Sequence, residues 1–225
     1  MTSVLRVADL GLRPYAPTLA LQESLVERRR RGEIADTLLL VEHLPVYTLG
    51  RRALEAHVLA SADELRQMGI EVIRTTRGGE VTYHGPGQLV GYPILDLGAQ
   101  GRGVAAYVDA LEDVIIAALA GFGVAGGKDR RRRGVWVGGE KIAALGVRVS
   151  RGISLHGFAL NVSTDLTPYR WIVPCGIRDR GVTALRALAP GAAMDSVKAA
   201  IVDAFVRVFG YGGWERADET GLAQS

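Results

Sequence analysis

RGGEVTYHGPGQLVGYP, residues 77–93, is the segment most informative about how this chain folds. It contains five glycines and two prolines, and it runs into a strand-like segment at residues 89–97. Glycine adopts positive φ angles and lets the backbone approach a ligand closely. Arg77, Tyr83 and His84 lie between these glycines, and a tight turn rarely needs such side chains. We therefore interpret the segment as a binding loop. The alternative is a turn in which the glycines only relieve steric strain.

The only cysteine of the chain, Cys175, lies in the segment IVPCGI at residues 172–177. Pro174 and Gly176 favour irregular backbone around it, where a side chain can be exposed at the end of a strand. A single cysteine often serves as a small buried apolar residue. The flanking residues instead indicate a thiol that is presented to a ligand.

A nucleophilic cysteine needs a nearby base or cation that holds it as the thiolate. Four side chains qualify by type, and their spacing does not choose among them: His43, His84, His156 and Lys141. Lys141 precedes an apolar run and is therefore expected at the start of a strand, where it can point into a cleft. The alternative is an ordinary surface lysine. His156 interrupts an apolar strand, a setting more typical of a structural histidine than of a base.

The composition indicates one globular domain. The chain has 225 residues, of which 48% are hydrophobic and 23% charged, and these values are typical of folded domains. One cysteine excludes an intrachain disulfide and fits a reducing compartment. We find no secretory signal, and no window approaches the roughly 18 consecutive apolar residues of a membrane span. We expect a cytoplasmic protein without membrane contact.

The net charge is +3 and the sequence pI is about 9.2, so the chain is mildly basic. Four consecutive arginines form the one dense basic run: Arg130, Arg131, Arg132 and Arg133. No aromatic residues are interleaved with this run, which argues against nucleic acid as a partner. Two interpretations remain open, a docking surface for an acidic carrier protein and a solvated loop.

Hydrophobic periodicity and capping signals predict both helices and strands. Helices are expected at residues 17–31, 61–68, 104–120 and 195–208, the second opened by a capping box at Ser61 and Glu64. Strands are expected at residues 37–41, 71–76, 89–97, 135–137, 142–149 and 154–162. Because the order lacks strict βαβ alternation, we predict an α+β fold with a mixed or antiparallel sheet. We expect a single domain over residues 1–225, with its core at about residues 37–210 and a frayed tail at residues 216–225.

Five segments, in order along the chain, resemble the octanoyl-(acyl carrier protein):protein octanoyltransferases, also called lipoyl/octanoyl transferases. They are EHLPVYTLGR (42–51), the segment at 77–93, GVWV with KIAALGV (134–137 and 141–147), HGFALNV (156–162) and IVPCGI (172–177). The resemblance covers about residues 37–185. Two positions depart from the family pattern, Leu155 before the His-Gly pair and Ala184 where serine is common.

The resemblance implies a biotin/lipoate protein ligase-like catalytic domain, with a mixed, largely antiparallel sheet flanked by helices. It also implies that Cys175 carries an acyl group and that Lys141 activates the thiol and shuttles protons. By the same match, the substrate pocket comprises Arg77, Gly78, Gly79, Glu80, Val81, Thr82, Tyr83, His84, Ala144, Leu145, Gly146, Gly157, Phe158 and Ala159. It implies no cofactor and no metal.

The implied reaction moves an octanoyl group from octanoyl-acyl carrier protein to a lysine of a lipoyl domain. The implied acceptors are E2 subunits of 2-oxoacid dehydrogenases and the glycine cleavage H protein. A thioester donor is already activated, so ping-pong transfer through a thiolate needs no ATP. Two other functions are considered. An ATP-dependent lipoate or biotin ligase needs no nucleophilic cysteine and would use a Gly-Arg-Gly-Arg loop, which this chain lacks. A non-catalytic acyl-binding protein would not need both Lys141 and Cys175.

Overall fold

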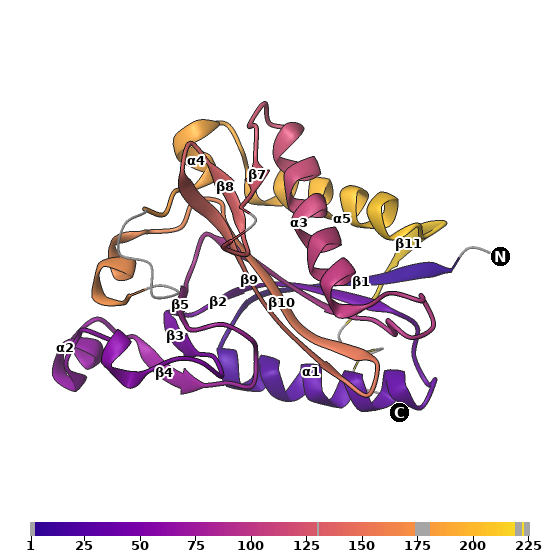
Figure 1. Ribbon diagram of the computed structural model, residues 1–225, viewed down its shortest axis with the longest axis horizontal. Coiled ribbons are helices and arrows are strands. Elements are labelled where there is room, and N and C mark those ends of the chain that lie inside the picture. The colour runs from indigo at the N-terminus through magenta and orange to yellow at the C-terminus, as the bar shows by residue number, and fades with distance from the viewer. Residues whose placement is uncertain (1–2, 130, 174–180, 219–221, 223–225) are drawn as a thin grey trace.

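The computed structural model describes residues 3–129, 131–173, 181–218 and 222 of the chain. Within these residues the strands form two sheets, of order β11-β1-β2-β6-β10-β9-β8-β7 and β4-β3-β5 (Figure 1). The strands are β1 (Val4–Arg13), β2 (Thr37–His43), β3 (Val46–Leu49), β4 (Glu71–Arg74), β5 (Val81–His84), β6 (Gln88–Ile94), β7 (Gly127–Lys128), β8 (Val135–Val137), β9 (Glu140–Ser150), β10 (Ile153–Asn161) and β11 (Gly213–Arg216). The helices are α1 (Tyr15–Arg30), α2 (Ala62–Gln67), α3 (Val104–Ala120), α4 (Leu185–Leu188) and α5 (Met194–Phe209), with 3₁₀ turns η1 (Glu55–His57) and η2 (Thr167–Trp171).

Strand direction in the larger sheet is mixed. β1 runs parallel to both β2 and β11. The successive pairs from β2 through β6, β10, β9 and β8 to β7 are all antiparallel. This arrangement confirms the α+β class with a mixed, largely antiparallel sheet.

Helices cover both faces of the larger sheet. α3 and α5 pack against each other, and their apolar faces form one cluster with residues such as Phe158 and Leu160 of β10. α1 lies on the opposite face (Figure 1), where Leu25 belongs to a second cluster with Val90 and Ala159. Adjacent residues of β10 therefore enter different cores, as alternation along a strand requires. None of the described helices is long and apolar enough to cross a membrane.

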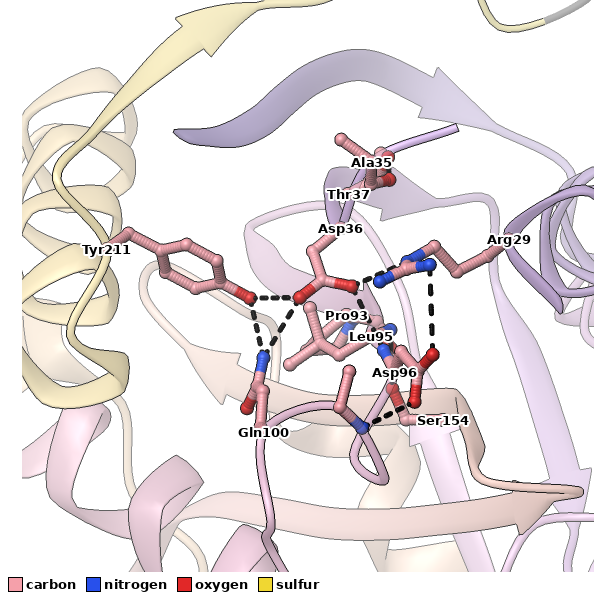
Figure 2. Close-up of polar contacts among 11 residues, drawn as sticks. Arg29, Ala35, Asp36, Thr37, Pro93, Leu95, Asp96, Gln100, Ser154 and Tyr211 are labelled. Carbon is pink, nitrogen blue, oxygen red and sulfur yellow. Dashed lines mark hydrogen bonds and ion pairs between the residues drawn. The ribbon is translucent and has the colours of Figure 1, made fainter. Parts of the chain in front are cut away.

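A buried polar cluster, the Asp36 cluster, joins several elements at one end of the sheet (Figure 2). Asp36 is 8% exposed, and Arg29 Nε of α1 lies 2.8 Å from its Oδ1 atom. The backbone N–H of Asp96 donates to Oδ1 at 2.9 Å. Gln100 Nε2 donates to Oδ2 at 2.9 Å, and the Tyr211 hydroxyl donates to Oδ2 at 2.7 Å. Four donors thus satisfy one carboxylate, which ties α1, the start of β2, the segment after β6 and the segment after α5.

Several expected elements are confirmed within a few residues. α3 and β8 have the expected bounds, and α1, β2, β6, β9, β10 and α5 differ from them only near their ends. α2 begins with the expected capping box, because Ser61 Oγ accepts from the Glu64 N–H and the Glu64 carboxylate accepts from the Ser61 N–H.

The structure corrects three expectations. Residues 81–84, which we expected in a loop, form β5. All four residues are buried, so they lack the alternation of buried and exposed positions that signals a strand. Residues 4–13, to which we assigned no element, form β1, which is bent by a register shift at Gly11. The described part of the tail is not frayed, because Ala217 and Leu222 are 5% and 1% exposed and pack in the cluster that Leu25 of α1 forms with the sheet.

Candidate active site

A narrow cavity of about 40 Å³ lies between the larger sheet and the segment that carries β5. Its floor consists of residues from β6, β9 and β10, its roof is the segment from Arg77 to His84, and Tyr15 of α1 reaches its wall. The lining residues are Tyr15, Arg77, Gly79, Glu80, Val81, Thr82, His84, Val90, Tyr92, Ala144, Leu145, Gly146, His156, Gly157, Phe158 and Ala159.

The floor is made of cross-strand pairs of small residues. Ala159 of β10 lies between Val90 of β6 and Ala144 of β9, and two residues along, Gly157 pairs with Gly146. A Cβ atom on Gly157 would lie 2.1 Å from the Gly91 carbonyl oxygen, and one on Gly146 would lie 2.9 Å from the Gly78 carbonyl oxygen. Glycine at 146 therefore lets the roof approach the floor closely, and glycine at 157 lets β10 and β6 approach each other within the floor.

Arg77 holds the roof together from inside. Arg77 is only 7% exposed. Its Nη2 donates to the Thr48 carbonyl at 2.5 Å, the Thr48 hydroxyl at 2.9 Å and the Glu80 carbonyl at 2.7 Å. These bonds fasten the glycine-rich segment to β3, and they explain why a loop of low intrinsic order keeps one shape.

A hydrogen-bonded chain leads from Thr48 toward the strand of Lys141. His84 Nε2 lies 3.2 Å from the Thr48 hydroxyl, and His84 Nδ1 donates to Gln88 Oε1 at 2.7 Å. Because that oxygen only accepts, the proton of the neutral ring is on Nδ1. Gln88 Nε2 then donates to Asn161 Oδ1 at 2.9 Å, and Asn161 Nδ2 donates to the Thr183 carbonyl at 3.0 Å. His84 is thus fixed on both ring nitrogens.

The three histidines near the cavity have lowered pKa values. Burial and, to a smaller extent, the nearby His43 and Arg77 side chains lower the pKa of His84 to about 3. Burial and the charge of Arg77 lower the pKa of His156 to about 3. Burial lowers the pKa of His43 to about 4. All three rings are neutral at pH 7 and are weak bases there.

Lys141 lies at the start of β9 and is 8% exposed. Its Nζ atom is 4.9 Å from the centre of the Trp136 ring, a distance at which an ammonium and an indole attract each other. The side chain lines a second cavity of about 20 Å³. That cavity shares Thr82 and Ala144 with the larger one. Lys141 therefore lies in a small cavity that adjoins the larger one at Thr82 and Ala144.

Cys175 and its neighbours at residues 174–180 lie outside the described residues. The described chain on either side is anchored. Before the segment, the Val173 N–H donates to the His57 carbonyl at 2.9 Å. After it, the Gly181 carbonyl accepts from the Lys141 N–H at 3.0 Å, and Val182 lines the small cavity with Lys141.

All the residues that we expected in a pocket line the larger cavity except Gly78 and Tyr83. Gly78 donates its N–H to the Val147 carbonyl. Tyr83 alternates with its β5 neighbours and packs against Tyr47 and Tyr169 instead. Sequence reasoning missed four lining residues: Tyr15, Val90, Tyr92 and His156. Val90 and Tyr92 lie in the segment at residues 77–93 that we interpret as a binding loop. His156 is one of the four candidate partners of Cys175, although its setting is more typical of a structural histidine. Tyr15 carries no signal in the sequence. Among the described residues no group of histidine and acidic side chains is arranged to hold a metal ion.

The sequence is similar to known proteins over most of its length. A family model for the lipoyl protein ligase A/B catalytic domain matches residues 14–206. The chain is 47% identical over 209 residues to an octanoyltransferase of Caldicellulosiruptor saccharolyticus, which covers 92% of this chain and 89% of that protein. It is 52% identical over 203 residues to an octanoyltransferase of Rubrobacter xylanophilus, covering 89% and 91%.

Solved structures share the fold at low sequence identity. A lipoate-protein ligase A bound with ATP has a TM-score of 0.75 at 16% identity, covering 98% of this chain and 91% of that one. A bipartite lipoate protein ligase from Thermoplasma acidophilum, studied with its E2 lipoyl domain, has a TM-score of 0.72 at 16% identity, covering 98% and 89%. A biotin protein ligase from Aquifex aeolicus has a TM-score of 0.52 at 13% identity, covering 93% and 70%. These likenesses confirm the expected biotin/lipoate protein ligase-like fold.

Proposed function

The chain belongs to the lipoyl protein ligase A/B catalytic domain family and is similar to its octanoyltransferases, and we propose that it transfers an octanoyl group in protein lipoylation. The proposed donor is octanoyl-acyl carrier protein. The proposed acceptor is a lysine of a lipoyl domain, in E2 subunits of 2-oxoacid dehydrogenases and in the glycine cleavage H protein. The observation that carries the proposal is the narrow cavity whose one end meets Lys141 through the shared residues Thr82 and Ala144.

The cavity suits an unbranched apolar chain. Its floor offers alanine, valine and glycine rather than charged groups, and these residues are held in register by the sheet. Burying about six methylenes at roughly 0.8 kcal/mol each contributes about 5 kcal/mol before ordering costs. An acyl chain of this length thus supplies enough binding free energy to hold the thioester at the Lys141 end.

The proposed mechanism has two transfers through Cys175. In the first, the thiolate attacks the donor thioester, the bond from the acyl carbon to the carrier sulfur breaks, and the carrier thiolate takes a proton. In the second, the neutral amine of the acceptor lysine attacks the acyl-Cys175 thioester, loses a proton, and the Cys175 thiolate departs. Both transfers need a group that receives a proton and returns it.

We assign that proton transfer to Lys141. The three histidines near the cavity are neutral, weakly basic and largely engaged in hydrogen bonds, which supports a lysine in this role. Lys141 is buried beside an aromatic ring at the end of the cavity. An ammonium near a thiol stabilises the thiolate.

One experiment tests the proposed function. The protein is mixed with octanoyl-carrier protein without ATP, and the intact mass is measured. We expect a mass increase of one octanoyl group, which hydroxylamine removes and which Cys175→Ala abolishes. Addition of a lipoyl domain should then discharge the adduct. Failure to form the adduct, together with pyrophosphate release from ATP and free octanoate, would instead assign the chain to the ATP-dependent ligases. A chain that binds octanoyl-carrier protein without either reaction would be a binding protein.

A further inference from the structure

We propose that the imidazole of His156, hydrogen-bonded to Thr76, closes the far end of the cavity and sets the longest acyl chain that the protein accepts. The inference rests on the proposed function, because it concerns the chain that occupies the same cavity. It deepens that function by assigning the chain-length limit to one side chain.

The register of the floor gives the cavity a direction. Asn161 of β10 pairs with Gln88 and lines the small cavity with Lys141. Moving along β10 away from this point, Ala159 pairs with Ala144, and Gly157 then pairs with Gly146. Ala144 lines both cavities, so the reacting end of the larger cavity lies at the Ala159–Ala144 pair, and the Gly157–Gly146 pair marks the opposite end.

His156 is one residue beyond that glycine pair, and its backbone is unusual. Its φ angle is 60°, in the left-handed region that non-glycine residues rarely adopt. The residue is 1% exposed, and its ring Nε2 lies 3.2 Å from the Thr76 hydroxyl. Thr76 directly precedes Arg77, the first residue of the roof. The ring thus bridges the floor strand and the roof segment and closes the gap between them.

The distance between the two ends fits a chain of medium length. Two residues of antiparallel strand span about 7 Å, so the step from the Ala159–Ala144 pair to the Gly157–Gly146 pair is of that size. The seven carbon–carbon bonds of an octanoyl group, each about 1.5 Å long, zigzag over less than 10 Å. A chain whose carbonyl lies beside the Ala159–Ala144 pair, where the two cavities share Ala144, therefore reaches the glycine pair and meets the His156 ring.

The wall that it meets carries no charge. The pKa of His156 is lowered to about 3, so the ring is neutral at pH 7. Tyr15 and Tyr92 near this end also remain neutral, since burial raises the pKa of both phenols. The buried guanidinium of Arg77 also lies near this end, but it donates to the Thr48 and Glu80 carbonyls. A neutral wall accepts a terminal methyl group without leaving an ion unsolvated.

Gly146 offers a change in the opposite direction. A Cβ atom at this position would lie 3.1 Å from Arg77 Cδ and 2.9 Å from the Gly78 carbonyl oxygen. Alanine there narrows the cavity just before the His156 ring. The two positions therefore predict opposite shifts in chain length, which general damage to the fold does not produce.

The test measures the rate of acyl-Cys175 formation with carrier proteins that bear six-, eight-, ten- and twelve-carbon chains. His156→Gly removes the ring and suits the left-handed backbone, so we expect the ten- to eight-carbon rate ratio to rise about tenfold or more, the effect of one or two methylenes in an apolar site. His156→Asn, which also tolerates this backbone, should give a smaller rise. Gly146→Ala should lower the eight- to six-carbon ratio.

Arg151→Gly is the matched control, because Arg151 is an exposed residue of the same β9–β10 hairpin with a φ angle of 50°. We expect its chain-length profile to equal that of the unaltered protein. An unchanged profile in folded His156→Gly and His156→Asn would overturn the assignment of the limit to His156. Failure of the unaltered protein to gain any octanoyl adduct would refute the proposed function instead, so the two failures are distinguishable.

Discussion

The Asp36 cluster and the chain of polar groups around His84 are both buried, but their charges are arranged differently. In the first, a carboxylate receives four donors and lies against a guanidinium. In the second, Arg77 donates to carbonyl and hydroxyl oxygens, and His84 is neutral between Thr48 and Gln88. In the first cluster the carboxylate is satisfied by its own neighbours, whereas Arg77 and His84 of the second line the larger cavity.

This difference indicates that the Asp36 cluster stabilises the fold, whereas the groups around His84 form part of the proposed reaction site. In a buried cluster of charged groups, each member is stabilised by the others. Removing one member therefore lowers the free energy of unfolding of the whole protein. The second cluster holds its one cation, Arg77, against uncharged oxygens and borders the cavity in which the proposed reaction would take place. Four predictions test the distinction, ordered from the largest effect to the smallest.

Lys141→Ala should have the largest effect on the reaction and little on stability. General acid–base catalysis contributes about 10²–10⁴-fold to rates, and we expect a loss of that size in octanoyl transfer. Lys141→Arg keeps the charge but cannot lose a proton near neutral pH. Compared with Lys141→Ala, it should therefore recover more of the rate of thiol alkylation than of the rate of octanoyl transfer. Unchanged thiol alkylation against pH in Lys141→Ala would move the role to another group.

Asp36→Ala should have the largest effect on stability. Removing one partner of a buried ion pair typically costs about 3–5 kcal/mol, because Arg29 and the Tyr211 and Gln100 donors lose their acceptor. Urea unfolding measures the loss. The folded fraction should transfer octanoyl groups at the rate of the unaltered protein. A large loss of transfer rate without a loss of stability would show that the two clusters are not separate in function.

Acidification should destabilise the protein through its neutral histidines. The pKa values of His43, His84 and His156 are lowered from 6.5 to about 4, 3 and 3. The unfolded chain therefore binds more protons below pH 6.5, and stability is full above that pH and falls as the pH drops toward 4. Three protons correspond to at most about 4 kcal/mol per pH unit. Urea midpoints measured between pH 7 and 5 test this, and His156→Asn should reduce the slope.

Arg133→Ser should have the smallest effect. Arg133 Nη1 pairs with Asp109 and lies 3.1 Å from Glu112 Oε2, both of α3. Exposed pairs contribute about 0–1 kcal/mol, so we expect a loss near the upper end of that range, since Glu112 is only 1% exposed. Transfer efficiency should keep its salt dependence. A weaker salt dependence in Arg133→Ser, with equal reactivity toward a short thioester, would favour the docking interpretation of the arginine run over the solvated loop.

The parts of the fold with local signals were predictable. The capping box at Ser61 and the apolar periodicity of residues 104–120 are local signals, because they lie within the helices that they predict. The structure has both helices, α2 and α3. β5 was not predictable, because its residues are buried on both sides by layers that lie far away in sequence. Tyr15 joins the cavity only because α1 packs beneath β6 and β10. The left-handed backbone of His156 likewise depends on tertiary context.

β1 has a consequence for how the protein is made. Its partner on one side is β2, which follows soon after it, but on the other side Val4 pairs with Gly213 of β11. During synthesis that edge of the sheet waits for almost the whole chain to emerge, and an open strand edge is a site where chains aggregate. The bend at Gly11, where the register shifts, interrupts the straight edge. The residues that pair with β11, Val4 to Val7, lie before this bend and therefore stay unpaired on that side until β11 arrives.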